Sequence, residues 1–253
     1  MAYLEQLLGA GAMRFNGAEL SAGHEAEELY STYRAFIVRH AEPEQYAFVT
    51  APLSPEGRAK ARIFPRRFAT DFAVDPLRRR LVCLRQSGRN RTRESAEETY
   101  LGFQEMIQEL GLANTVVLLP VEDPELLTTA PFQILMEKYN VPRELLQDTW
   151  EAFSSDELHE RAVPTAREVG EHMLRKILRN AALLQKKRPA FEVWDFWFTH
   201  ETAHIGILRL DSPGESFKIG YLEIIEAYRD LVSGRVMKTF RGTSGLLPSP
   251  SDN

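Results

Sequence analysis

Segments typical of β-strands alternate with segments typical of α-helices along most of this chain. The strand-like runs lie at about residues 34–39, 80–86, 115–120, 191–199 and 216–224. Apolar residues at helical spacing separate several of these runs, at about 54–72, 91–110 and 165–187. This alternation is typical of βαβ units, in which helices connect parallel strands. The sequence therefore predicts a three-layer α/β/α fold with a mainly parallel central sheet.

The same pattern predicts how the chain is organised. No Gly/Ser-rich or Pro-rich linker interrupts the middle of the 253 residues, so we expect a single domain over residues 1–241. Residues at about 124–160 read as a helical insertion, which we expect to cap the functional site. Residues 242–253 are rich in Gly, Ser and Pro, and we expect them to be a disordered tail.

Composition and charge argue against several classes of protein. The net charge of −5 argues against a nucleic-acid-binding protein. No apolar run approaches the roughly 18 residues that would span a membrane, and residues 1–23 lack the pattern of a secretory signal. A single cysteine, Cys83, cannot form a disulfide framework or a cysteine-based zinc site within one chain. We therefore expect a soluble, cytoplasmic protein without membrane or nucleic-acid partners, and the sequence does not indicate its oligomeric state.

The first predicted strand ends on two functional side chains, Arg39 and His40. Open α/β sheets bind ligands at the carboxyl edge of their strands, which is where these side chains should lie. The guanidinium of Arg39 suits phosphate oxygens, and the imidazole of His40 can act as a nucleophile or carry a proton. The pair alone is more typical of an ordinary strand end with two surface polar residues, so the rest of the chain has to decide.

A second polar turn follows the second predicted strand. Residues 87–97 carry three arginines at alternate positions, Arg89, Arg91 and Arg93, just where a helix should begin. The first turn of a helix presents unpaired N–H groups and the positive end of the helix dipole, which suits an anion. This turn therefore predicts a phosphate or carboxylate site, unless the arginines pair with the nearby glutamates on a solvated face.

Four motifs in order resemble those of the histidine phosphatase superfamily, which contains the cofactor-dependent phosphoglycerate mutases. Residues 39–42 resemble its Arg-His-Gly motif, with Ala41 in place of glycine. Residues 52–61 are similar to its Pro-Leu-Thr-x-x-Gly-x-x-Gln-Ala helix start, and residues 87–97 to its Ser-x-x-x-Arg element. Residues 198–200 resemble the late strand that ends in the family's second histidine. The resemblance spans about residues 33–205 and implies a phosphoglycerate mutase-like fold.

The resemblance also implies a reaction. His40 would be the nucleophile that forms a phosphohistidine, and the chain would be a phosphatase acting on a small phosphorylated substrate. Arg39, Arg91 and His200 would bind the phosphoryl oxygens, with His200 counted among the catalytic residues. No metal or cofactor is implied, because arginines would supply the positive charge.

The family's proton donor is the least visible element in this sequence. In one branch the donor is a glutamate after the third strand, a position that Glu122 fits, with Asp123 beside it. In the other branch an acidic residue directly follows the second histidine, and Glu201 occupies that place. We rank Glu122 first and keep Glu201 as the alternative acid.

A zinc-dependent hydrolase is a competing hypothesis. Residues 200–204 satisfy His-Glu-x-x-His, in which His200 and His204 would bind zinc from one helix face and Glu201 would act as base. The predicted strand at 191–199 runs directly into His200, which argues against a helix at that point. Ile207 also occupies a position that the extended form of the motif gives to glycine.

Two further hypotheses use the phosphate site itself. A phosphoryl mutase would transfer the group back to a bound product, although residues 43–46 differ from the segment that mutases carry after the nucleophile. A non-catalytic phosphate-binding module would retain phosphate affinity without turnover, and Glu201, where glycine is usual, fits such a decayed site.

Overall fold

The computed structural model describes residues 33–44, 51–126, 130–188, 190–210, 217, 219–229 and 236–241. In this part of the chain six strands form one sheet, in the order β3-β2-β4-β1-β5-β6. The strands are β1 (Tyr33–Arg39), β2 (Arg80–Gln86), β3 (Val116–Glu122), β4 (Glu192–Thr199), β5 (Ile224–Arg229) and β6 (Val236–Arg241). β1 to β4 are mutually parallel, whereas β5 and β6 are antiparallel additions next to β1. The predicted mainly parallel sheet is confirmed.

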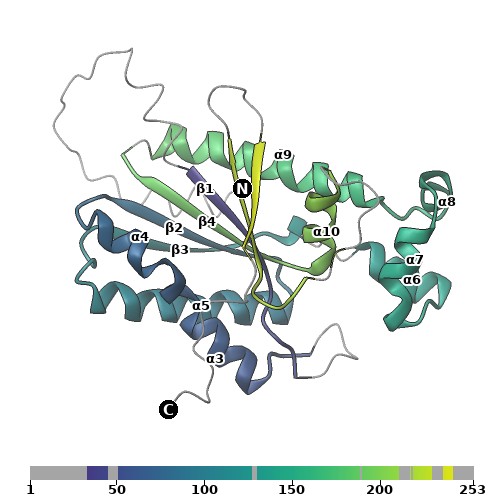
Figure 1. Cartoon of the computed structure of the whole chain (residues 1–253), viewed down its shortest axis with the longest axis horizontal. Helices are drawn as coiled ribbons and strands as arrows, with labels where there is room; N and C mark the ends of the chain where they lie inside the picture. Colours follow the sequence, from purple (N-terminus) through teal and green to yellow (C-terminus); the bar gives the residue numbers. More distant parts are fainter. Residues whose placement is uncertain are drawn as a thin grey trace.

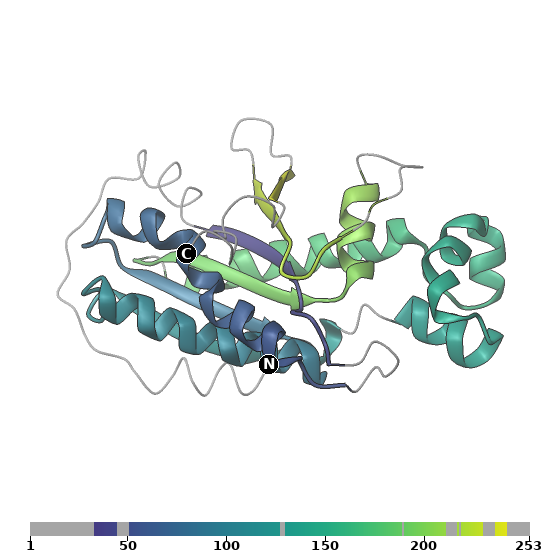
Figure 2. The same cartoon turned by 60° about the horizontal axis from the view of Figure 1, so that its bottom comes forward.

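Helices cover both faces of the sheet, which confirms the three layers (Figures 1 and 2). α3 (Pro55–Ile63), α4 (Ala69–Val74) and α5 (Asn90–Glu109) lie on one face, and α9 (Ala166–Lys187) and α10 (Glu201–Arg209) lie on the other. Neighbouring residues of β1 alternate between the two cores: Phe36 packs with the first group of helices and Ile37 with the second. This two-sided burial explains why the strand reads as a continuous apolar run.

Several helix boundaries follow from local signals in the sequence. Ser54 caps α3 by accepting a hydrogen bond from the N–H of Gly57, and Thr165 forms a capping box with Glu168 at the start of α9. The prediction of one continuous helix at 54–72 is wrong, because a 3-10 helix, η1 (Phe64–Phe68), separates α3 from α4. Pro65 lies in that interruption, where its missing N–H cannot continue the α-helical pattern.

The predicted strand at 216–224 is also wrong. β5 begins only at Ile224, and β6 was not predicted at all. Leu222 has a φ of +57°, which is incompatible with an extended strand. Backbone hydrogen bonds from Leu222 N to Arg39 O (3.0 Å) and from Arg39 N to Glu223 O (3.1 Å) still hold this segment against the end of β1. It therefore runs directly past the predicted site.

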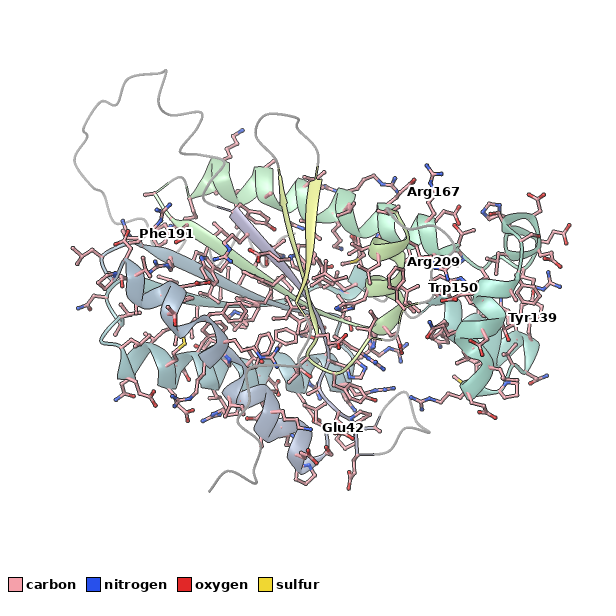
Figure 3. The ribbon with its side chains drawn as sticks, viewed as in Figure 1. Glu42, Tyr139, Trp150, Arg167, Phe191 and Arg209 are labelled. Atoms are coloured by element: carbon pink, nitrogen blue, oxygen red, sulfur yellow. The ribbon has the colours of Figure 1, made fainter. Side chains whose placement is uncertain are left out.

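The insertion at 124–160 is helical where it is described. It contains η2 (Pro124–Leu126), α6 (Ala130–Tyr139), η3 (Arg143–Leu145), α7 (Leu146–Ala152) and α8 (Ser155–Glu160). α6, α7 and α8 lie together beyond the carboxyl ends of the parallel strands (Figure 1). An ion pair of 2.7 Å between Glu151 of α7 and Arg209 of α10 connects these helices to the helices that cover the sheet. Figure 3 shows Arg209 near Trp150, which is also in α7.

The disordered tail predicted at 242–253 lies outside the described residues. Among the helices that the structure describes, none combines the length and apolar character needed to cross a bilayer.

Candidate active site

His40 lies immediately after β1 with its ring buried. Its N–H donates a backbone hydrogen bond to Thr199 O (3.0 Å), at the end of the neighbouring strand β4. Its Nδ1 lies 2.7 Å from Ala41 O, and a carbonyl oxygen can only accept, so Nδ1 carries the hydrogen. Burial, together with His200 and Arg91, holds the pKa of His40 well below its ordinary value. His40 is therefore a neutral imidazole whose lone pair is on Nε2.

The loop after His40 is held from two sides. Ala41 N donates to Ser95 Oγ (2.8 Å), and Ser95 Oγ in turn donates to Arg91 O (2.6 Å) in the first turns of α5. On the other side Ser54 N donates to Glu42 O (2.9 Å). Gly57 permits this approach, since a Cβ there would lie 2.2 Å from Glu42 O. Figure 3 shows Glu42 beside α3, so both helix-start motifs of the sequence support the position of His40.

Arg91 and His200 are the polar side chains that lie next to His40. Arg91 lies in the first turn of α5 with its side chain largely buried, and burial and the nearby Arg143 lower its pKa to about 10. His200 is the N-cap residue of α10, with its ring centroid 5.2 Å from that of His40. Burial and the charge of Arg91 lower the pKa of His200 to about 3, so this ring is also neutral. Ser87 Oγ lies 3.5 Å from His200 Nε2.

Arg39 forms an ion pair with Glu201, at 3.0 Å between Nη2 and Oε2. Its guanidinium also lies over the ring of Tyr221, 4.5 Å from the centroid, and donates to Ile219 O. Glu201 is the first residue of α10, and burial raises its pKa despite the opposing charge of Arg39. The site thus contains a partly buried carboxyl group that holds its proton more readily than an exposed glutamate does.

A cavity of about 100 Å³ connects these groups to the insertion helices. Four of the residues that line it lie at the strand ends and the start of α5. We call these residues, Arg39, His40, Arg91 and His200, the phosphate cradle. Glu201 also lines the cavity, and the opposite side is formed by residues of α6, η3 and α7. All the predicted phosphate-binding residues therefore lie around one space.

Glu122 lies elsewhere. It is the last residue of β3, and one of its carboxylate oxygens would lie 3.2 Å from a Cβ at Gly88. It lines a separate hollow together with Arg93 and Tyr100, and it is absent from the lining of the cavity that holds His40. The strand order explains this placement, because β4 and β2 separate β3 from β1.

The structure also brings in two residues that the sequence does not indicate. Arg143 reaches the cavity from η3. Tyr221 lies just before β5, with its ring centroid 5.7 Å from that of His40. No local pattern marks either residue, since both depend on how distant segments pack against the end of β1.

The geometry does not favour the zinc hypothesis. His204 is in α10, but its Nε2 lies 3.1 Å from Ile37 O, so its ring faces the backbone of β1 and does not line the cavity. Glu226 of β5, which pairs with β1, accepts a hydrogen bond from Arg34 (2.8 Å). Within the described ranges no group of three or more His, Cys, Asp or Glu side chains is placed to hold a metal ion.

Comparison with known proteins finds similarity only at the level of solved structures. No family model matches the chain, and no curated protein matches it. A phosphoglycerate mutase from Bacillus anthracis is similar at 12% identity and a TM-score of 0.49, over 85% of this chain and 94% of that one. A mycobacterial glucosyl-3-phosphoglycerate phosphatase is similar at 10% identity and a TM-score of 0.47, over 82% of this chain and 96% of that one.

A phosphoserine phosphatase from Entamoeba histolytica is similar at 14% identity and a TM-score of 0.40, over 85% of this chain and all 100% of that one. One mutase and two phosphatases are thus among the solved structures that this chain resembles.

Proposed function

We propose that this chain is a phosphatase that hydrolyses a phosphomonoester through a phosphohistidine on His40. The observation that carries the proposal is the state of His40: a buried, neutral imidazole whose Nδ1–H donates to Ala41 O and whose lone pair is therefore on Nε2. A neutral nitrogen with an unshared pair is the form that attacks phosphorus. The two arginines of the phosphate cradle supply the positive charge that a phosphoryl group needs.

In the first step Nε2 of His40 bonds to phosphorus while the ester P–O bond breaks in line with it. Arg39, Arg91 and His200 would bind the three equatorial oxygens, whose charge distribution changes in the transition state. The leaving oxygen takes a proton from an acid. In the second step a water attacks phosphorus, the N–P bond breaks, and the acid's conjugate base accepts the proton of that water.

Glu201 is the acid that the geometry favours. It lines the cavity with His40, and burial raises its pKa, which keeps a proton available for the leaving oxygen. Glu122, ranked first from the sequence, lines a different hollow. The ion pair with Arg39 would hold the carboxylate of Glu201 in place once its proton has been transferred.

The direct test is release of p-nitrophenol from p-nitrophenyl phosphate near pH 6 in the presence of a chelator, with His40→Ala in parallel. We expect chelator-resistant turnover that is abolished in His40→Ala, and a ³²P-labelled, acid-labile adduct in the wild-type chain only. Turnover that survives in His40→Ala would refute the mechanism. Phosphate binding without turnover on any ester would favour the non-catalytic module.

A further inference from the structure

Apolar side chains from α6 and α7 lie opposite the phosphate cradle, next to Arg143 of η3. Phe132 and Met136 lie four residues apart on α6, hence on one face of that helix, and Leu146 begins α7. We call Phe132, Gln133, Met136 and Leu146 the wall of the cavity. A group attached to a phosphate in the cradle would extend towards this wall.

The wall is held by the core of the insertion. The ring of Phe132 packs edge-on against Trp150 with centroids 5.5 Å apart, and Trp150 donates from Nε1 to Pro164 O (2.8 Å). Leu146 and Trp150 are both buried in the same apolar cluster. The apolar surface is therefore preformed, and a ligand would not have to order it.

The polar side chain of the wall is already engaged. Gln133 accepts a hydrogen bond from Arg89 through Oε1 (3.2 Å) and donates one to Glu137 through Nε2 (2.9 Å). A leaving group rich in hydroxyls, such as a sugar, would bring donors and acceptors against Phe132, Met136 and Leu146. Burying hydroxyls without partners opposes binding, whereas burying hydrocarbon there favours it.

The charge of the cavity suits a phosphate group. Three arginines line it and the two histidines are neutral, so the net charge of the lining is +2 when Glu201 is ionised and +3 when Glu201 holds the proton that the first step requires. A phosphomonoester carries a charge of about −1.5 to −2 near neutral pH. One phosphate group therefore offsets the larger part of this charge.

We propose that the substrate is the monophosphate ester of an apolar alcohol, whose hydrocarbon part lies against Phe132, Met136 and Leu146. The inference rests on the proposed function in one respect, namely that the phosphate binds in the cradle around His40. It separates this chain from enzymes built for sugar phosphates or for phosphorylated acids.

The test measures binding of alkylphosphonates, which the enzyme cannot hydrolyse, to the full chain by titration calorimetry. The series is methyl-, butyl-, hexyl- and octylphosphonate, with carboxyethylphosphonate as the probe for a second anionic site. We expect the dissociation constant to fall by up to about three- to fourfold for each added methylene until the cavity is filled. Carboxyethylphosphonate should bind no more tightly than methylphosphonate.

A matched pair of variants locates the effect. Met136→Gln keeps the length of a wall side chain but makes it polar, and it should flatten the chain-length dependence while leaving the affinity for methylphosphonate unchanged. Leu145→Gln changes a neighbouring leucine that is 47% exposed and does not line the cavity, and it should preserve the dependence. Unchanged methylphosphonate binding also shows that the variant is folded around the cradle.

The outcomes separate this inference from the proposed function. A flat series in the wild-type chain, or preferred binding of carboxyethylphosphonate, would overturn the apolar-ester inference even if p-nitrophenyl phosphate is hydrolysed. If affinity increases with chain length but no ester is hydrolysed, the result would support the ligand class and refute the phosphatase. If no phosphonate binds at all, the apolar-ester inference fails, and His40-dependent hydrolysis of p-nitrophenyl phosphate decides the proposed function separately.

Discussion

Arg39 and Glu201 form an ion pair across the ends of two adjacent parallel strands, with 3.0 Å between Nη2 and Oε2. Arg39 ends β1, and Glu201 follows β4 after His200. This pair places a carboxyl group next to the phosphate cradle. It also connects the group that would bind a phosphoryl oxygen with the group that would protonate the leaving oxygen.

The assignment of Glu201 as the acid predicts a dependence on the leaving group. An alkoxide needs a proton far more than p-nitrophenolate does, so Glu201→Gln should lower kcat/KM for hexyl phosphate by about 10²-fold or more. The loss for p-nitrophenyl phosphate should be below about tenfold. Steady-state kinetics with both esters checks this difference.

Glu122→Gln is the control for that experiment, because it removes the other candidate acid from its separate hollow. We expect kcat/KM for both esters to stay within about twofold of the wild-type value. If Glu122→Gln instead shows the leaving-group-dependent loss, the proton donor is Glu122, and the cavity must rearrange when substrate binds.

The pKa directions predict an enzyme that favours acid pH. His40 must be neutral to attack, and its pKa lies well below the ordinary value of about 6.5. Lowering the pH should therefore leave His40 neutral until the pH reaches that lowered pKa. Glu201 must be protonated in the first step, and its raised pKa extends the pH range over which it holds that proton. We therefore expect kcat/KM for hexyl phosphate to be higher at pH 5 than at pH 7.5.

The ester itself also titrates, with a second ionisation near pH 6, so the informative quantity is the ratio of wild-type to Glu201→Gln activity at each pH. That ratio should fall as the pH rises through the pKa of Glu201, because the acid loses its proton. A ratio that stays constant from pH 5 to 7.5 would contradict the role of Glu201.

Arg91 offers a test of the cradle with a close control. Arg91 is largely buried in the cavity, whereas Arg93, two residues along the same helix, is about half exposed and lies 3.9 Å from Glu97. Arg91→Met should lower kcat for p-nitrophenyl phosphate by about 10²–10³-fold, as expected when one electrostatic donor to the transition state is lost. Arg93→Met should change it by less than about twofold, and similar losses in both variants would argue against a specific role for Arg91.

The fold was predictable because its signals are local. The apolar run of β1, the Ser54 cap and the Thr165 capping box each depend on a few neighbouring residues. The order of the strands is not a local property. Glu122 ends β3 and Glu201 follows β4, so both lie at the carboxyl end of a parallel strand. Of these two strands only β4 pairs with β1, and the sequence alone could not show this.

Other parts of the site depend on contacts between distant segments. Tyr221 lies beside Arg39 and His40 because the backbone turns at Leu222, a non-glycine residue in the left-handed region, where the sequence suggests an uninterrupted strand. Arg143 reaches the cavity only because the insertion helices pack over the strand ends. Neither residue carries a pattern that could reveal its position.

Gly57 provides a test of how the helix-start motif supports the nucleophile. A Cβ at this position would lie 2.2 Å from the backbone oxygen of Glu42, so Gly57→Ala must move α3 or the loop after His40. Inserting such a group into a packed contact should lower the free energy of unfolding by about 1–3 kcal/mol. Because Glu42 is two residues from His40, we also expect kcat for p-nitrophenyl phosphate to fall by about tenfold or more, since small displacements of a nucleophile are costly. Ala59→Ser, on the exposed side of α3, should change neither thermal unfolding nor turnover appreciably. If Gly57→Ala retains full turnover despite lower stability, the contact between α3 and Glu42 supports the fold without positioning His40.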